Sequence, residues 1–170
     1  MAAKRQNKVA IRNAIENELF SLMKQKGFDD FSICELCDAA GVGRSSFYRY
    51  YDSKEEVLAV YLLRIWRAWC EANGVRDKSG FSLENASSFI CHVYENREVF
   101  DMIYQNNLDR VITMLIDRNI KSGKFVKDYG VSFFVYGVFG MLKDWWARGY
   151  TDPPEELIGV IENIFTHAGE

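Results

Sequence analysis

The side chains with the clearest chemical potential lie in one short stretch, from Arg44 to Tyr51, which reads R-S-S-F-Y-R-Y-Y. An arginine can bind guanine edges or phosphates, small hydroxyls permit close approach, and tyrosine hydroxyls reach phosphate oxygens. These residue types favour contact with a nucleic acid over catalysis. On a helix, the outward positions of the stretch would be Arg44, Ser45, Tyr48 and Arg49, with Ser46 and Tyr50 to the sides.

Two short helices and a tight turn are expected to position these side chains. Ser32 can cap a helix that runs to about residue 40, with Glu35 closing an S-x-x-E capping box. Gly41 supplies the positive φ that the turn needs, and the second helix covers about 44–51. This is helix-turn-helix geometry, although a small amphipathic hairpin could also serve packing alone. The shared core would contain Ile33, Leu36, Cys37, Ala40, Val42, Phe47 and Tyr51.

Hydrophobic periodicity predicts helices throughout the chain and no strand. One helix covers about 9–26 and ends at Gly27. A second S-x-x-E box at Ser53 starts a helix over 53–72, and Lys54 adds charge where the amides of a helix N-terminus favour an anion. The predicted fold is all-α, with about eight helices: a helix-turn-helix domain over 1–54 and a helical domain over 55–170, connected by helix 53–72. The remaining helices are expected at about 82–95, 97–121, 126–148 and 152–167.

Composition places the chain among folded globular proteins: of 170 residues, 48% are hydrophobic and 26% charged. No apolar run approaches the roughly 18 residues of a membrane helix, and the N-terminus lacks the apolar core of a signal peptide. We therefore expect a cytoplasmic protein without a membrane partner. Residues 1–54 carry nine basic and seven acidic residues, a net charge of +2, whereas the remainder carries 12 basic and 17 acidic residues, a net of −5.

The sequence offers few of the residues that a redox site, a metal site or a catalytic site would need. The Cys34-x-x-Cys37 pair lacks the strand context of a thioredoxin-like site, and a redox role for it is a minor hypothesis. There is no Gly-rich phosphate loop, Ser/His/Asp set or carboxylate pair at catalytic spacing. We expect no enzyme, no metal and no cofactor. The other potential metal ligands are scattered singly, at Cys70, Cys91, His92 and His167.

A series of motifs follows this organisation: K-G-F at 26–28, A-G-V at 40–42, F-Y-R-Y-Y at 47–51 and S-K-E-E-V-L at 53–58. Together they make residues 14–58 resemble the DNA-binding domain of the TetR family of bacterial transcriptional regulators. Two positions depart from the family pattern: Gly43 stands where Ser is frequent, and Tyr50 where His is common. The operator sequence therefore does not follow from the resemblance.

The resemblance implies a role for each matching position. Arg44 and Ser45 would approach base edges, with Arg49 and Tyr50 nearby, while Phe47 and Tyr51 match core positions. Phosphates would be held by Ser32, Ser46, Tyr48 and Lys54. At the N-terminus, Lys4, Arg5 and Lys8 form either an arm beside the duplex or a solvated tail.

The resemblance also implies a homodimer in which the last two helices of each chain form a four-helix bundle. The helix over 126–148 is apolar around most of its circumference, so it must be buried on more than one side. An intramolecular core could absorb one of the last two helices, but hardly both. The candidate interface residues are Phe133, Tyr136, Gly137, Gly140, Leu157, Ile161, Ile164 and Phe165.

Control by an effector is the last expectation. The stretch from Tyr136 to Gly149 resembles the C-terminal domain of a TetR branch that includes regulators of dihydroxyacetone kinase operons, some of which answer to a protein partner. The effector, a small molecule or a protein, is thus left open. We expect a dimeric repressor that reads an inverted-repeat DNA operator, and the alternative is a helical interaction module that acts through a protein partner. The family places a small ligand near Trp66, Trp69, Phe89, His92, Met102, Tyr104 and Phe133, all of which could also be plain core.

Overall fold

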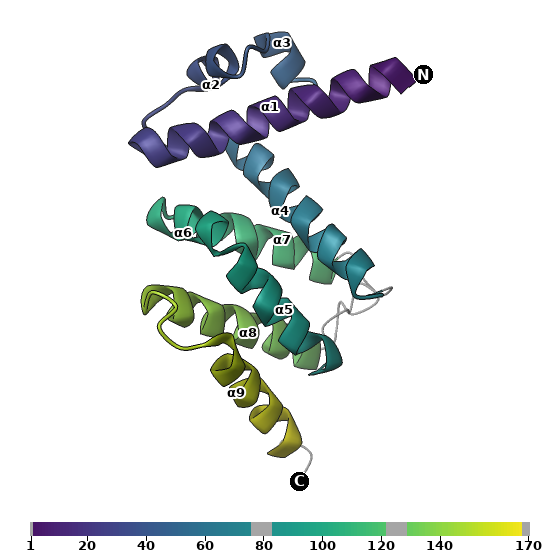
Figure 1. Cartoon of the computed structure of the whole chain (residues 1–170), viewed down its shortest axis with the longest axis vertical. Coiled ribbons are helices and arrows are strands. Elements are labelled where there is room, and N and C mark those ends of the chain that lie inside the picture. The colour runs from purple at the N-terminus through teal and green to yellow at the C-terminus, as the bar shows by residue number, and fades with distance from the viewer. Residues whose placement is uncertain (1, 76–82, 122–128, 168–170) are drawn as a thin grey trace. The chain divides into compact units, whose positions relative to one another are not determined.

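The computed structural model describes residues 2–75, 83–121 and 129–167, including the side chains of all of these except 2–7, 83–84, 119–121, 131 and 165–167. In these ranges the chain is helical and contains no strand, which confirms the predicted all-α fold. None of the helices described there combines the length and the apolar character needed to cross a membrane. In chain order the helices (Figure 1) are α1 (Ala2–Lys26), α2 (Ile33–Ala39), α3 (Arg44–Phe47), α4 (Lys54–Ala72), α5 (Leu83–Glu95), α6 (Arg97–Gln105), α7 (Asp109–Lys121), α8 (Tyr129–Ala147) and α9 (Pro154–His167).

Packing divides the chain into two compact units. The first unit contains residues 1–64 together with 102–112, and the second contains residues 65–101 together with 113–170. Helices α4, α6 and α7 contribute residues to both units. The boundary expected at residue 54 stays a prediction, because these units follow spatial proximity rather than chain order.

One expected helix is two helices in the structure. The sequence pattern predicts a continuous helix over 97–121, but α6 ends at Gln105 and α7 begins at Asp109. Asn107 takes a φ of +54°, and the Leu108 N–H donates to the Ile103 carbonyl at 2.8 Å. These are the features of a helix that ends in a Schellman motif, with asparagine in the position where glycine is most frequent.

The short helix α3 is also smaller than expected. It covers Arg44–Phe47, whereas the pattern predicts a helix over 44–51. The chain continues as a tightened turn, since the N–H of Tyr50 donates to the Phe47 carbonyl three residues earlier, at 2.8 Å. The N–H of Tyr51 donates to the same carbonyl at 3.0 Å, so the backbone keeps its helical direction for one more turn.

The first unit has its core around α1. Figure 1 shows α2 and α3 beside this helix. Ile15 and Leu19 of α1 are completely buried, and so are Leu36 of α2 and Phe47 of α3. The helix-turn-helix segment is therefore packed against the long helix α1 through a shared buried core.

The second unit has a core formed by α5, α8 and α9. Trp145 of α8 is fully buried, stacks on the Tyr94 ring at 5.5 Å and donates its indole N–H to the Asp152 carbonyl at 2.8 Å. Leu157 and Ile161 of α9 belong to this core, with 7% and 2% of their surface exposed. Both are also candidate residues of the dimer interface. The side of α9 that carries them packs within its own chain, and their part in a dimer stays a prediction.

Candidate nucleic-acid interface

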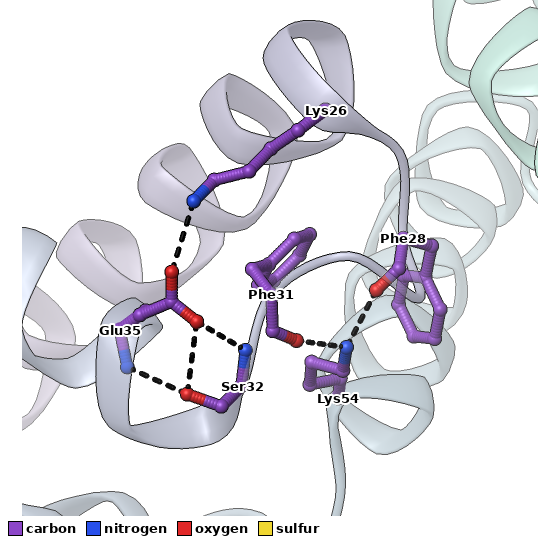
Figure 2. A network of polar contacts seen from close by, with 6 residues as sticks. All are labelled: Lys26, Phe28, Phe31, Ser32, Glu35 and Lys54. Carbon is purple, nitrogen blue, oxygen red and sulfur yellow. Dashed lines mark hydrogen bonds and ion pairs between the residues drawn. The ribbon is translucent and has the colours of Figure 1, made fainter.

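Helix α2 begins with the capping box that the sequence predicts. The hydroxyl of Ser32 accepts the Glu35 N–H at 3.2 Å, and the Glu35 carboxylate accepts the Ser32 N–H at 2.9 Å. The second carboxylate oxygen binds the Lys26 ammonium at 2.9 Å (Figure 2). The Ser32 N–H, followed by Lys26, lowers the pKa of Glu35 to about 2. Ser32 also donates its hydroxyl proton to Glu35 at 3.1 Å, so this hydroxyl is engaged within the cap.

The start of α4 holds the turn between α1 and α2. The Lys54 ammonium donates to the carbonyls of Phe28 and Phe31, each at 2.5 Å (Figure 2). It also lies 4.5 Å from the Phe28 ring centroid and 4.2 Å from that of Phe31. Burial lowers the pKa of this lysine, against the opposing effect of nearby carboxylates, of which Asp29 is the strongest. Sequence reasoning missed this local role, because both carbonyls belong to the backbone.

The predicted second capping box is only half formed. The hydroxyl of Ser53 accepts the Glu56 N–H at 3.1 Å, as expected. The Glu56 carboxylate, however, accepts the N–H of Asp52 at 2.5 Å. The reciprocal bond therefore falls one residue before the serine that caps α4.

The turn between α2 and α3 has the geometry that the sequence predicts. Gly41 takes a φ of +63°, where only a residue without a Cβ is free of strain. The Val42 N–H donates to the Cys37 carbonyl at 2.9 Å and closes the end of α2. Gly43 precedes α3 without a side-chain cap, as its departure from the family pattern implies.

The segment from Arg44 to Tyr50, here called the reading segment, has two different sides. On one side Phe47 is fully buried, and its ring contacts that of Tyr51 at 5.7 Å between centroids. On the other side Ser45, Arg49 and more than half of the Tyr48 surface are exposed. The full set of predicted outward residues, Arg44, Ser45, Tyr48 and Arg49, is exposed, and the predicted lateral residues, Ser46 and Tyr50, are half-buried.

A further cation from α1 lies beside this segment. The ammonium of Lys8 is exposed and lies 5.5 Å from the centroid of the Tyr50 ring. Lys4 and Arg5 precede it on the same helix, but their side chains lie outside the described residues. The arm expected at the N-terminus is thus represented in the structure by Lys8 alone.

Helix α2 carries two free thiols, those of Cys34 and Cys37. Cys37 is buried in the helix-turn-helix core, and burial raises the pKa of its thiol. Cys34 is half-buried, and its sulfur lies 3.9 Å from the Asp38 carboxylate. Within the described ranges no group of three or more potential ligands is arranged to hold a metal ion.

Four of the residues expected at an effector site form one aromatic cluster in the second unit. Trp66, Trp69 and Phe89 lie with their ring centroids 5.1–5.4 Å apart, and the His92 ring lies 6.4 Å from that of Trp69. The Nε2 atom of His92 is buried and has no hydrogen-bond partner among the described residues. Burial lowers the pKa of this imidazole, against the opposing charge of Glu95.

The other three residues expected at that site are Met102, Tyr104 and Phe133, and their part in an effector site stays a prediction. Met102 and Tyr104 are buried in the first unit, on the last turn of α6. Phe133 on α8 is 78% exposed, so it does not line a buried pocket. Helical spacing alone could not separate these residues from the cluster, because it does not reveal on which unit a side chain packs.

Two residues with polar roles escaped sequence reasoning. Glu16 on α1 is buried, and Asn106 accepts the Phe28 N–H at 2.6 Å. Glu16 shares the i, i+3, i+7 spacing of Leu19 and Met23, which is the one signal that could have placed it on the buried side. Nothing in the sequence pairs Asn106 with a residue 78 positions earlier.

The capped helix α2, the Gly41 turn and the two-sided reading segment define a helix-turn-helix protein with a helical C-terminal part. A family model described as bacterial regulatory proteins of the tetR family matches residues 19–61, and one described as a transcriptional regulator C-terminal region matches residues 82–167. The chain belongs to the TetR family of bacterial transcriptional regulators and is a DNA-binding regulator of transcription. No curated protein and no solved structure matches it.

Proposed function

We propose that the protein is a homodimeric repressor that reads an inverted-repeat operator through residues 44–51 of each chain. The observation that carries this proposal is the two-sided character of the reading segment. Phe47 and Tyr51 are fixed in the core, while Arg44, Tyr48 and Arg49 are exposed. Side chains that project from an immobilised backbone can be presented to base edges in a fixed geometry.

Each exposed side chain has a proposed role. Arg44 and Ser45 approach base edges, with Arg49 and Tyr50 beside them, because a guanidinium can bind guanine through two hydrogen bonds. Ser46 and Tyr48 bind phosphates. The family resemblance also implies phosphate contacts for Ser32 and Lys54, but the hydrogen bonds of both within the chain favour a structural role. No catalytic step is part of this proposal.

Dimerisation is supported by an exposed apolar stripe on α8. Tyr129, Phe133 and Tyr136 follow one another at four- and three-residue steps, and the first two are 89% and 78% exposed. A Cβ placed on Gly137 or Gly140 would meet nothing within 4 Å, so a partner helix could approach closely there. Ile164 on α9 is also exposed, whereas the side chain of Phe165 lies outside the described residues. A second copy of this chain would bury these residues.

Control is proposed to act through the aromatic cluster of the second unit. A ligand with one polar group beside flat apolar surface would satisfy the orphaned His92 Nε2 and stack on the neighbouring rings. Anilinonaphthalene sulfonate is a suitable probe of this chemistry. Enhanced probe fluorescence that is lost in His92→Phe would support the proposal. Equal enhancement in both proteins would contradict a role for His92 in holding the ligand.

Selection of binding sequences from a random duplex pool tests the proposal, and it should be repeated at two salt concentrations. We expect an enriched inverted repeat that binds more weakly at high salt, because phosphate contacts release counterions. Arg44→Ala should reduce the preference for the selected duplex over random DNA. Absence of enrichment with a folded dimer would contradict the proposal and favour the interaction module.

A further inference from the structure

Glu16 is the one buried charged residue in the described part of the chain, with 2% of its surface exposed. Its two carboxylate oxygens have different partners. Oε1 accepts the phenol proton of Tyr51 at 3.4 Å, and Oε2 binds Nη2 of Arg64 at 2.5 Å. The guanidinium of Arg12 donates to the same phenol oxygen at 3.3 Å. One carboxylate on α1 is therefore bonded both to the residue that follows the reading segment and to the middle of α4.

Tyr51 is the anchor of the reading segment on its inner side. It is 1% exposed, its ring contacts that of Phe47, and its N–H closes the last turn through the Phe47 carbonyl. Burial, assisted by the charge of Glu16, raises the pKa of its phenol, although Arg12 opposes this. The phenol therefore stays protonated and acts as a hydrogen-bond donor to Glu16. A displacement of the Glu16 carboxylate would therefore shift Tyr51 and, with it, the reading segment.

Arg64 brings α4 to the same carboxylate. Its side chain is half-exposed, and its guanidinium carbon lies 4.8 Å from the centroid of the Tyr61 ring on the same helix. Arg64 is the last residue of α4 in the first unit, and the helix continues into the second unit from Ile65. The ion pair thus joins α4 to the buried carboxylate at the point where the helix leaves the first unit.

We propose that Glu16 is a positioning residue for DNA recognition: it fixes the reading segment relative to α4 through Tyr51 and Arg64. The inference rests on the proposed function, because it requires the reading segment to contact DNA. Glu16 is buried, so its proposed effect on DNA binding is indirect. It acts by restricting the orientations that the reading segment can adopt, and operator recognition depends on that restriction.

The competing view is that this network only stabilises the fold. Removing one partner of a buried ion pair destabilises a protein whether or not the pair serves function. A loss of stability alone therefore decides nothing. The readout that separates the two views is the ratio of affinities for the selected operator and for random duplex, measured well below the unfolding midpoint of each variant.

The experiment compares four variants of the full-length chain. Three are the single variants Glu16→Gln, Arg64→Gln and Tyr51→Phe, and the fourth combines Tyr51→Phe with Arg64→Gln. Arg67→Gln is the matched control for Arg64→Gln. Arg67 is also an exposed arginine on α4, and its replacement likewise removes one positive charge. We expect Glu16→Gln to lower operator affinity about ten-fold and random-duplex affinity less than about three-fold, a size typical of residues within one network. Arg67→Gln should leave the ratio unchanged.

The pair Tyr51→Phe and Arg64→Gln tests the coupling through the carboxylate. If Glu16 transmits the position of one partner to the other, the double variant should lose no more discrimination than the more damaged single variant. If the ratio in every folded variant equals that of the wild type, the inference is wrong and the network only supports the fold. If Glu16→Gln does not fold, the other two single variants decide by the same ratio.

Arg44→Ala separates this inference from the proposed function. A reduced ratio in Arg44→Ala with an unchanged ratio in the Glu16, Tyr51 and Arg64 variants overturns the inference alone. An unchanged ratio in Arg44→Ala means that the segment does not read DNA, and both statements are then wrong. Reduced ratios in Arg44→Ala and Glu16→Gln, with Arg67→Gln unaffected, support both.

Discussion

Replacement of Lys54 by methionine tests whether this residue supports the fold or binds DNA phosphate. In the structure its ammonium donates to the carbonyls of Phe28 and Phe31 at 2.5 Å each. Methionine keeps an apolar stem of similar length against the two phenylalanine rings but removes both hydrogen bonds. The variant therefore isolates the ammonium from the rest of the side chain.

The magnitude follows from the two bonds. A hydrogen bond from a charged donor contributes about 1.5–3 kcal/mol, which gives about 3–6 kcal/mol for the pair. The lysine side chain is only partly buried, so solvent already screens part of this contribution and the net loss is smaller. We expect Lys54→Met to lower the free energy of unfolding by about 2–3 kcal/mol, measured by chemical denaturation.

DNA binding supplies the second readout. Each lost phosphate contact flattens the slope of log affinity against log salt concentration by about 0.9. If Lys54 is structural, Lys54→Met keeps the wild-type slope, because no phosphate contact is lost. Unchanged stability together with a flattened slope in Lys54→Met would refute this reasoning and restore the phosphate contact that the family resemblance implies.

Three further predictions concern other parts of the chain. Phe133→Asp should convert a dimer to a monomer in analytical ultracentrifugation, while Tyr48→Asp, at another exposed aromatic, should leave the dimer intact; a dimeric Phe133→Asp would contradict the interface. The Glu35 carboxylate, whose pKa is lowered to about 2, stabilises the fold above its usual value of 4.5 and loses this effect as the pH falls towards 2. The thermal midpoints of wild type and Glu35→Gln should therefore converge on acidification, and a constant difference would exclude the carboxylate charge as the cause. Trp145→Ala should lower the free energy of unfolding by about 3–5 kcal/mol, because it empties a fully buried site, and a loss below about 1 kcal/mol in chemical denaturation would contradict that packing.

The sequence predicted those features that depend on near neighbours in the chain. Gly41 marks its turn because a positive φ excludes most other residues, and the Ser32 capping box joins residues three positions apart. The burial of Phe47 followed from helical spacing, and so did the exposure of Arg44. In each case the physical cause acts within one or two helical turns.

The break between α6 and α7 shows where such local rules stop. Apolar spacing continues across residues 106–108, and the stretch contains neither proline nor glycine. Asn107 nevertheless adopts a positive φ, which asparagine tolerates better than most residues. Asn106 next to it accepts the N–H of Phe28, so a contact with a residue 78 positions away lies directly at the break. Periodicity predicts which side of a helix is buried, but not which backbone group comes to meet it.

Ser32 and Lys54 show that contacts within the chain also matter for the interpretation of DNA binding. The family resemblance places both at phosphates, yet the hydroxyl of one closes the cap of α2 and the ammonium of the other binds two carbonyls in the turn before it. Both sets of hydrogen bonds connect the helices that support the reading segment. We propose the same role for the Glu16 carboxylate on α1. If these residues act only within the chain, loss of any of them would weaken DNA binding without removing a contact to DNA. Affinity alone therefore cannot identify the DNA-contacting residues of this protein. A residue that supports the fold and a residue that contacts DNA can be told apart only by measuring stability, salt slope and operator preference together.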